Sequence, residues 1–224
     1  MANVMKVALA TGNNGKLAEF DGYLRTLRME MFQGPKLKFP PEVGDDYLRN
    51  AIGKAQHGAK EWGVVCVGED SGIEVAGLNN LPGPFSARFA HFDRRVIEEG
   101  IKRRTLAGAS FNGPDGNADD KANNQLILDL LRGKTGVDRY ARYVACIAVA
   151  DPSGKVLYVT HASVDGFILD APRGDKGFGF DPIMEFFDFP GRSVAELTMD
   201  EKNLVSHRGH AIQNLMAWLA RAYA

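Results

Sequence analysis

The sequence has few cysteines and lacks a long apolar run. Its 224 residues include two cysteines, Cys66 and Cys146, which lie in the apolar stretches V-V-C-V and V-A-C-I-A-V-A. This usage indicates buried, reduced thiols in a reducing compartment, with a disulfide as the alternative. The apolar stretch near the start breaks at Thr11, too early for a signal peptide, and none approaches membrane-spanning length. We therefore expect a soluble, cytoplasmic protein without a membrane partner.

The sequence also lacks an excess of charge of either sign. Its 27 basic residues nearly balance its 28 acidic residues, giving a net charge of −1. Duplex nucleic acid favours a basic surface, so no nucleic-acid partner is expected, although a local anion site stays open. Histidine and cysteine are not grouped at zinc-ligand spacing. The length fits one large domain, or one domain with a lobe.

The apolar pattern predicts strands mixed with helices. We expect strands over residues 4–10, 29–33, 64–68, 73–77, 142–150 and 155–162, and helices over 16–27, 45–62, 119–131 and 211–223. The helix over 45–62 carries an apolar stripe of Leu48, Ala51, Ala55, Ala59 and Trp62. Because strands and helices do not alternate strictly, the pattern favours an α/β or α+β fold with a mixed sheet.

The first candidate site is T-G-N-N-G-K, from Thr11 to Lys16, between a strand and a helix. Its glycines let the backbone approach a ligand, the following helix start favours an anion, and Lys16 adds positive charge. It is not a Walker A loop, because Leu17 stands where a Ser or Thr would bind magnesium. On these residues alone, phosphate binding and a plain strand-to-helix turn are equally good interpretations.

Two further candidates are acidic. Glu69 and Asp70 follow a predicted buried strand in G-E-D-S-G, a sequence that is also typical of a turn. Strand alternation would point Glu69 and Asp70 in opposite directions, and we expect a cation and solvent to meet the two charges. Glu42 precedes the helix that carries Asn50 and Lys54 one turn apart, and it is either a ligand for a hard cation or an ordinary acid at a helix start.

Two late segments complete the candidates. In G-F-G-F-D-P, from Gly177 to Pro182, a ring between glycines could stack on a nucleobase, or both rings could belong to the core. In E-K-N-L-V-S-H-R, from Glu201 to Arg208, Arg208 could donate a forked pair of hydrogen bonds. The alternative is a solvated helix start with Ser206 as a cap.

Taken in chain order, these segments resemble the inosine/xanthosine triphosphate pyrophosphatase family of ITPase-like enzymes. The matching stretches fall between about residues 6 and 215: A-T-G-N-N-G-K, E-V-G-D-D-Y-L-R-N-A-I-G-K-A, G-E-D-S-G, L-P-G-P-F-S-A-R-F, G-F-G-F-D-P-I, A-E-L and E-K-N-L-V-S-H-R-G. Each motif alone is weak, but all of them in this order are specific.

The resemblance implies magnesium-dependent hydrolysis of purine nucleoside triphosphates with a 6-keto base, such as ITP, dITP and XTP, to the monophosphate and pyrophosphate. It also implies a single domain over residues 1–224, with an elongated mixed β-sheet flanked by helices, two lobes, a central cleft, and a homodimer. The alternatives are a pyrophosphatase with shifted nucleotide specificity and a non-catalytic nucleotide-binding module.

The resemblance assigns roles by matching positions. Glu42 and Asp70 match the Mg²⁺ ligands, Asp70 also matches the residue that activates water, and Lys54 matches a catalytic lysine facing the phosphates. The residues expected to bind substrate are Thr11, Asn13, Lys16, Ser71, Phe178, Gly179, Phe180, Asp181, Lys202, Ser206, His207 and Arg208. Among them Phe178 would stack on the base. Forked donors from Arg208 to the 6-keto oxygen would disfavour a 6-amino base, and mismatches of this kind can reach roughly 10⁴-fold.

One segment departs from the family pattern. Residues 91–110 are longer than the usual connection and carry the highly charged stretch R-R-V-I-E-E-G-I-K-R-R, which predicts an added helix. The insertion could be a lid, a changed dimer surface or a contact with a different substrate. A solvated extra helix is the simpler interpretation.

Overall fold

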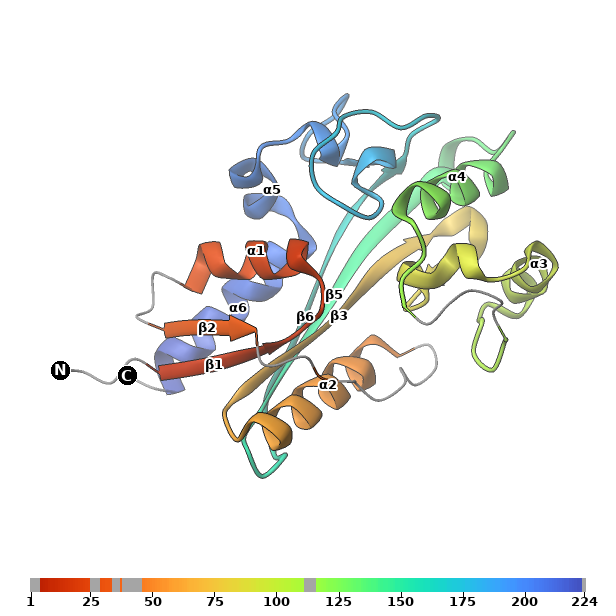
Figure 1. The fold of residues 1–224 in the computed structure, drawn as a ribbon. Coiled ribbons are helices and arrows are strands. Elements are labelled where there is room, and N and C mark those ends of the chain that lie inside the picture. Colours follow the sequence, from red (N-terminus) through yellow and green to blue (C-terminus); the bar gives the residue numbers. More distant parts are fainter. Residues whose placement is uncertain (1–4, 25–28, 34–36, 38–45, 111–115, 223–224) are drawn as a thin grey trace. The chain divides into compact units, whose positions relative to one another are not determined.

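The computed structural model describes residues 5–24, 29–33, 37, 46–110 and 116–222. The chain divides into two compact units (Figure 1). Unit 1 comprises Met1–Asp70, Ala145–Ala162 and His207–Ala224, and unit 2 comprises Ser71–Val144 and Ser163–Ser206. Three strands contribute residues to both units.

The described residues form a seven-stranded mixed sheet, which confirms the predicted mixed α/β fold. Its strands pair in the order β2-β1-β3-β5-β6-β7, with β4 on β3. β1 is parallel to β2 and β3, whereas β4 is antiparallel to β3 and β7 is antiparallel to β6. The strand bounds are Met5–Ala10 (β1), Met29–Gln33 (β2), Cys66–Val75 (β3), Leu81–Gly83 (β4), Tyr140–Ala150 (β5), Val156–Ile168 (β6) and Met184–Phe186 (β7).

The helices follow the predicted positions closely. Unit 1 contains α1 (Asn14–Leu24), α2 (Tyr47–Trp62) and α6 (His207–Ala222), and unit 2 contains α3 (Arg94–Arg103), α4 (Asp120–Leu130) and α5 (Met199–Val205). Thr198 and Glu201 form a capping box at the start of α5. α6 begins at His207 rather than at residue 211, so the S-H-R segment crosses from the end of α5 into the first turn of α6.

The sheet of unit 1 has helices on both faces (Figure 1). Val7 and Leu9 of β1 and Val67 of β3 share a buried cluster with Phe20 of α1 and with the inner face of α6. Ala8 and Ala10 alternate with these residues along β1, and both are buried. In unit 1, Val7, Leu9 and Val67 therefore face α1 and α6, whereas Gly68 faces α2.

The contact between α2 and β3 depends on small residues. Ala51, Ala55 and Ala59 are fully buried, and a Cβ added to Gly68 would lie 2.2 Å from the carbonyl oxygen of Ala51. Leu48, which the sequence places in the same stripe, is instead 39% exposed in the first turn of the helix. This part of the prediction was wrong because the close approach of α2 to the sheet leaves space for alanine rather than for leucine.

The segment around the two acids is one continuous strand. The sequence predicts two strands separated by a turn, but β3 runs without a break from Cys66 to Val75. Its second half pairs with β4, with Ile73 opposite Gly83 and Val75 opposite Leu81. This pairing keeps the backbone extended through Ser71 and Gly72, so Glu69 and Asp70 lie within a strand rather than in a turn.

Unit 2 has its own core, built from residues such as Ile73, Phe89, Ile127 and Phe186. The helix predicted within residues 91–110 is confirmed, because α3 places Ile97 in this core and presents its charged side chains to solvent. On the exposed face Arg94 pairs with Glu98 at 3.0 Å, and Lys102 pairs with Glu99 at 2.7 Å. The helix is therefore solvated on one face but packed on the other.

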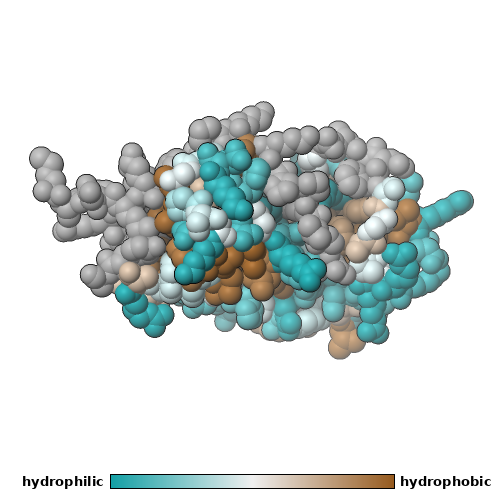
Figure 2. Space-filling model, turned by 90° about the horizontal axis from the view of Figure 1, so that it is seen from below, coloured by the Kyte–Doolittle hydropathy of each residue, from teal (hydrophilic) through white to brown (hydrophobic). Residues whose placement is uncertain are grey.

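The prediction of two buried thiols without a disulfide is confirmed. Cys66 and Cys146 are buried thiols and are not joined in a disulfide. Burial raises the pKa of the Cys66 thiol to about 12. Figure 2 views the molecule from the α2 side of Figure 1 and shows hydrophobic residues gathered in one area among hydrophilic ones. Within the described residues, no helix combines the length and the apolar character needed to span a bilayer.

Candidate active site

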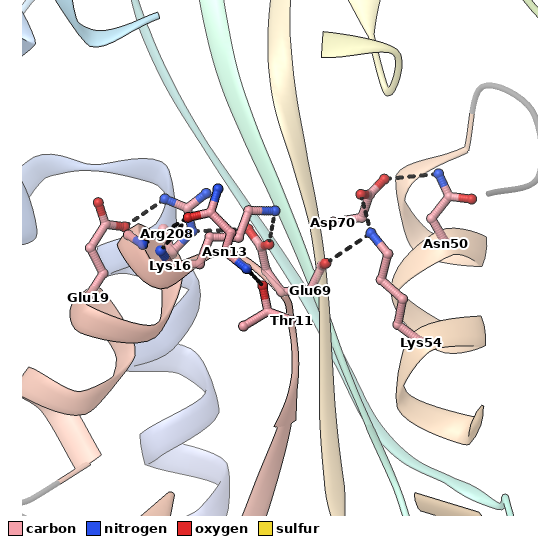
Figure 3. A network of polar contacts seen from close by, with 10 residues as sticks. Thr11, Asn13, Lys16, Glu19, Asn50, Lys54, Glu69, Asp70 and Arg208 are labelled. Carbon is pink, nitrogen blue, oxygen red and sulfur yellow. Dashed lines mark hydrogen bonds and ion pairs between the residues drawn. The ribbon is translucent and has the colours of Figure 1, made fainter. Parts of the chain in front are cut away.

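The two acids of β3 lie on opposite faces of the sheet of unit 1 (Figure 3). Asp70 points toward α2, whereas Glu69 points toward α1 and α6, as strand alternation predicts. Both side chains are buried, with exposed fractions of 4% for Asp70 and 2% for Glu69. One dipeptide therefore supplies carboxylates to two different layers of unit 1.

Asp70 is held by two side chains of α2. The Nδ2 atom of Asn50 donates to its Oδ2 atom at 2.9 Å, and the Nζ atom of Lys54 donates to its Oδ1 atom at 2.8 Å. Lys54 also donates to the backbone carbonyl of Glu69 at 3.4 Å. Asn50 and Lys54 are four residues apart, so they project from the same face of the helix. The carboxylate of Asp70 is thus fixed in position and lies against a cation.

Glu69 belongs to a buried group of four charged residues (Figure 3). Its carboxylate meets Nζ of Lys16 at 2.6 Å and Nε of Arg208 at 3.0 Å, and Nη1 of Arg208 donates to Glu19 at 2.6 Å. Burial alone would raise the pKa of Glu69, but Lys16 and Arg208 together hold it well below its usual range. Burial alone would lower the pKa of Arg208, but Glu69 and Glu19 raise it. The two positive and two negative charges balance.

The expectation that solvent would meet the two acids was wrong. Lysine and arginine side chains surround them instead, and both carboxylates are almost fully removed from water. The physical reason is the continuous strand, because residues in the middle of a sheet are covered by helices on both faces. The sequence contains the required cations, but only the fold shows that they replace water.

The loop from Thr11 to Lys16 is stabilised by its own side chains. Thr11 Oγ1 accepts from the backbone N–H of Asn13 at 3.1 Å. Asn13 Oδ1 accepts from the N–H groups of Gly15 and Lys16, at 2.8 and 3.2 Å, and so caps the start of α1. The local geometry is that of a capped strand-to-helix turn, with Lys16 directed to Glu69. The phosphate-binding role of Thr11, Asn13 and Lys16 stays a prediction.

In unit 2 the predicted base-binding loop surrounds Phe178. Asp181 Oδ2 accepts from the backbone N–H of Phe178 at 2.9 Å and from Nζ of Lys202 at 2.6 Å. The hydroxyl of Tyr143 donates to Asp181 Oδ1 at 3.3 Å. Nζ of Lys202 lies 4.7 Å from the centroid of the Phe178 ring, which is a cation–π contact. The structure therefore brings Phe178, Asp181 and Lys202 together.

The other predicted substrate residues occupy different environments. Phe180 is buried in the core of unit 2 with 6% of its surface exposed, whereas Gly179 and Ser71 are half-buried. Ser206 ends α5 and His207 begins α6, and both are buried. Ser206 is thus the C-terminal cap residue of α5 and also directly precedes the first residue of α6. The substrate contacts of these residues stay predictions.

Arg208 is placed differently from its expected use as a reader of the base. Two carboxylates of unit 1 already accept from its Nε and Nη1 atoms, and only 3% of its surface is exposed. Because these N–H groups already donate to carboxylates, the guanidinium has fewer N–H groups available for a forked contact to a base. The role of Arg208 in discriminating between 6-keto and 6-amino bases stays a prediction.

The predicted metal ligands are only partly covered by the structure. Glu42 lies outside the described residues, and the part of the chain that is described holds no group of three or more His, Cys, Asp or Glu side chains that could bind a metal ion. Asp70 itself fits a hard cation such as Mg²⁺, which is commonly bound through one or two carboxylates together with substrate phosphates. Its oriented carboxylate and the neighbouring Lys54 suit a site for anionic phosphate and metal.

Several residues of these clusters escaped the sequence analysis. Asn50 contacts Asp70, Glu19 contacts Arg208, and Tyr143 contacts Asp181. For Asn50 the signal was present, since it lies one turn before Lys54 on the same helix face. Glu19 and Tyr143 give no such signal, because their partners are far away in the chain.

Three features together define an ITPase-like α/β protein: the mixed sheet, the paired Asp70 and Lys54, and the Phe178 loop. The chain belongs to the Ham1 family, whose family model matches residues 7–218. This match confirms the resemblance inferred from the ordered motifs.

Named relatives and solved structures agree with this assignment. The chain is 35% identical over 218 residues to a dITP/XTP pyrophosphatase of Thermus thermophilus, covering 96% of this chain and 92% of the relative. It is 37% identical over 218 residues to a dITP/XTP pyrophosphatase of an Exiguobacterium species, covering 95% of this chain and 96% of the relative. The structure of a HAM1 protein from Coxiella burnetii matches with a TM-score of 0.75 and 32% identity, covering 97% of this chain and all of that one.

Proposed function

We propose that this chain hydrolyses non-standard purine nucleoside triphosphates, such as ITP, dITP and XTP, to the monophosphate and pyrophosphate. The observation that carries the proposal is the carboxylate of Asp70, fixed by Asn50 and Lys54 on one face of the sheet. The names of the relatives, dITP/XTP pyrophosphatases, support the substrate class.

The residues of unit 1 can act on the triphosphate. An ammonium 2.8 Å from Asp70 stabilises the carboxylate form, which is the form that accepts a proton from water. The attacking water would then add to the α-phosphorus, and the bond from that phosphorus to the bridging oxygen would break. Lys54, with Lys16 and the backbone of the Thr11–Lys16 loop, would neutralise phosphate charge.

We assign Mg²⁺ to Asp70 and Glu42. A bound magnesium ion would supply positive charge that stabilises the departing pyrophosphate. Asn50 keeps the Asp70 carboxylate in one orientation, so that a ligand oxygen is available without a prior rearrangement. Lys54 would shield this oxygen from the negative phosphates.

The Phe178 loop of unit 2 can receive the purine base. The half-buried ring of Phe178 would stack on the base, since stacking tolerates any ring while edge contacts select among bases. Lys202 and Asp181 fix the ring and the adjacent backbone, and Ser206, His207 and Arg208 are the candidates for contacts to the 6-keto edge. Gly179, Phe180 and Ser71 complete the proposed substrate residues.

A panel of nucleoside triphosphates with Mg²⁺ tests the function directly. We expect pyrophosphate from ITP, dITP and XTP, and much slower release from ATP, whose base carries a 6-amino group. The proposal fails if every purine triphosphate survives or if only orthophosphate appears. Tight nucleotide binding without turnover would indicate a binding module instead.

Asp70→Asn tests the chemical role within the same assay. The substitution keeps the shape and the contact to Lys54, but it removes the proton acceptor, so we expect nearly all turnover to be lost in a folded protein. Asp188→Asn changes an exposed acid of the same kind and serves as the control. Near-normal rates in Asp70→Asn would remove Asp70 from the mechanism.

Metal removal provides a separate test. We expect EDTA to abolish pyrophosphate release from ITP, and added Mg²⁺ to restore it. Full activity after exhaustive chelation would contradict the assignment of Mg²⁺ to this chain.

We also propose a homodimer and a cytoplasmic location. Exposed aromatic residues support the homodimer: Phe187 is 50% exposed, Phe167 is 40% exposed, and their ring centroids lie 5.1 Å apart. Tyr140 contacts both rings. Grouped exposed rings of this kind are typical of protein interfaces. The two buried thiols are consistent with a reducing compartment.

A further inference from the structure

Helix α4 contacts the loop that carries Phe178 through two side chains on consecutive turns. Asp120 Oδ2 accepts from the backbone N–H of Gly179 at 2.7 Å, and Asn124 Nδ2 donates to the carbonyl of the same glycine at 3.0 Å. The two residues are four apart in α4 and therefore lie on one face of the helix. Helix α4 therefore bonds to both the N–H and the carbonyl of Gly179.

These contacts complete the fixation of the backbone around Phe178. Asp181 already accepts from the N–H of Phe178, and the backbone N–H of Asp181 donates to the carbonyl of Phe178 at 3.3 Å. Gly179 has φ of +62°, a conformation that glycine adopts readily but that a side chain would disfavour. Asp120 and Asn124 bond to its N–H and its carbonyl, next to the residue that carries the ring.

Asn124 carries a second, unusual feature. Only 5% of its surface is exposed, and its Oδ1 atom has no hydrogen-bond partner in the part of the chain that the structure describes. The carbonyl of Gly179 requires a donor, which assigns Nδ2 to that side of the amide and Oδ1 to the other. A buried acceptor without a partner is unfavourable for stability. An apolar residue of similar size would avoid this cost but could not hold the loop.

We propose that Asp120 and Asn124 are positioning residues, which hold the Phe178 loop in the conformation that binds the purine base. The inference rests on the proposed function, because it assumes that Phe178 stacks on the base. Neither residue touches the substrate in this role. Their effect is to order the loop before binding, which improves affinity without altering the chemical step.

Kinetics of Asn124→Leu with ITP and Mg²⁺ test this role. We expect KM for ITP to rise about tenfold with kcat retained, while the free energy of unfolding is unchanged or higher. Inorganic tripolyphosphate, which has no base, should inhibit the variant and the unchanged protein equally well. Gln125→Leu is the matched control, because Gln125 is exposed on the same helix and bonds only to Asp129 among the described residues.

Two outcomes would overturn the proposal. An unchanged KM for ITP in Asn124→Leu would show that the loop needs no such partner. A parallel rise in KM and in the inhibition constant of tripolyphosphate, with a less stable fold, would indicate a general structural role.

Hydrogen exchange separates failure of this inference from failure of the proposed function. In Asp120→Ala the amide of Gly179 loses its acceptor, so the peptide over residues 177–181 should exchange faster than in the unchanged protein. This measurement needs no substrate. If no purine triphosphate is hydrolysed but exchange accelerates, the proposed function is wrong, while the role of Asp120 in holding the loop is supported. Unchanged exchange would contradict the proposal that Asp120 holds the loop.

Discussion

Glu69 is the residue on which the charge balance of unit 1 depends. Its side chain is fully buried and contacts both Lys16 and Arg208. Without it, the buried Arg208 would lose a carboxylate partner and keep Glu19, and the half-buried Lys16 would lose its ion pair. A buried ion pair is poor evidence for net stability, but removing one partner is costly because the other charges stay buried.

We predict that Glu69→Gln lowers the free energy of unfolding by about 3 kcal/mol at pH 7. Because the folded-state pKa of Glu69 is depressed, its contribution is fully present above the pKa of an unfolded glutamate, about 4.3, and is lost as the pH falls below it. The difference between the two proteins should therefore shrink at pH 3. Urea unfolding at both pH values measures it.

Glu98→Gln is the control for this substitution. Glu98 pairs with Arg94 on the surface of α3, where such pairs contribute less than about 1 kcal/mol. An equal loss of stability in both variants would mean that the buried pairs of Glu69 contribute no more to the free energy of unfolding than a surface pair.

At the scale of elements, the approach of α2 to β3 positions Asp70. Asn50 and Lys54 reach the carboxylate only because the helix lies close to the strand, and that closeness requires a residue without a side chain at Gly68. A Cβ there would lie 2.2 Å from the carbonyl of Ala51 and 2.5 Å from the amide nitrogen of Ala55.

We predict that Gly68→Ala lowers the free energy of unfolding by about 3 kcal/mol, since the obstructing atoms belong to the backbone and cannot rotate away. Gly53→Ala, within α2, is the control: an added Cβ meets nothing within 4 Å among the described residues, and alanine favours a helix by about 1 kcal/mol. Thermal unfolding compares them. A stable Gly68→Ala would show that the helix can withdraw freely from the strand.

Helix α3 is a second element with a testable role. Ile97 is fully buried in the core of unit 2, and the backbone carbonyl of Ile101 accepts from Asn79 at 2.9 Å. These contacts describe a helix packed on its own unit.

We predict that Ile97→Ala destabilises the protein by about 3 kcal/mol, because a buried cavity forms. Lys102→Ala, on the exposed face of the same helix, should change stability by less than about 0.5 kcal/mol. Chemical denaturation measures both. A small effect of Ile97→Ala would favour a loosely attached lid over a packed helix.

At the scale of the whole molecule, we assign the homodimer to the aromatic group formed by the exposed Phe167 and Phe187 with the half-buried Tyr140. We predict that the chain of 24.4 kDa sediments at twice its mass, and that Phe187→Ser shifts it toward the monomer. Leu204→Ser is the control, since Leu204 is also a large exposed apolar residue of unit 2, at 69%. Sedimentation of the unchanged protein as a monomer would contradict the assignment.

The sequence by itself determined the elements and much of the candidate site. Periodicity located the helices and most strands, since amphipathic spacing is a local property. Alternation along the strand correctly separated Glu69 from Asp70. Ordered motifs pointed to the family and to the cluster of Phe178, Asp181 and Lys202. Each of these inferences needs only neighbouring residues or their order along the chain.

The tertiary structure alone decided which side chains contact these residues. That β3 continues through Ser71 and Gly72 depends on its pairing with β4, and that Leu48 is exposed depends on the closeness of α2 to the sheet. Lys16 and Arg208, rather than water, surround Glu69, and Asp120 with Asn124 holds Gly179. These contacts join segments far apart in the chain, because folding packs helices on both faces of a sheet, and no local pattern encodes which distant side chain fills each buried position.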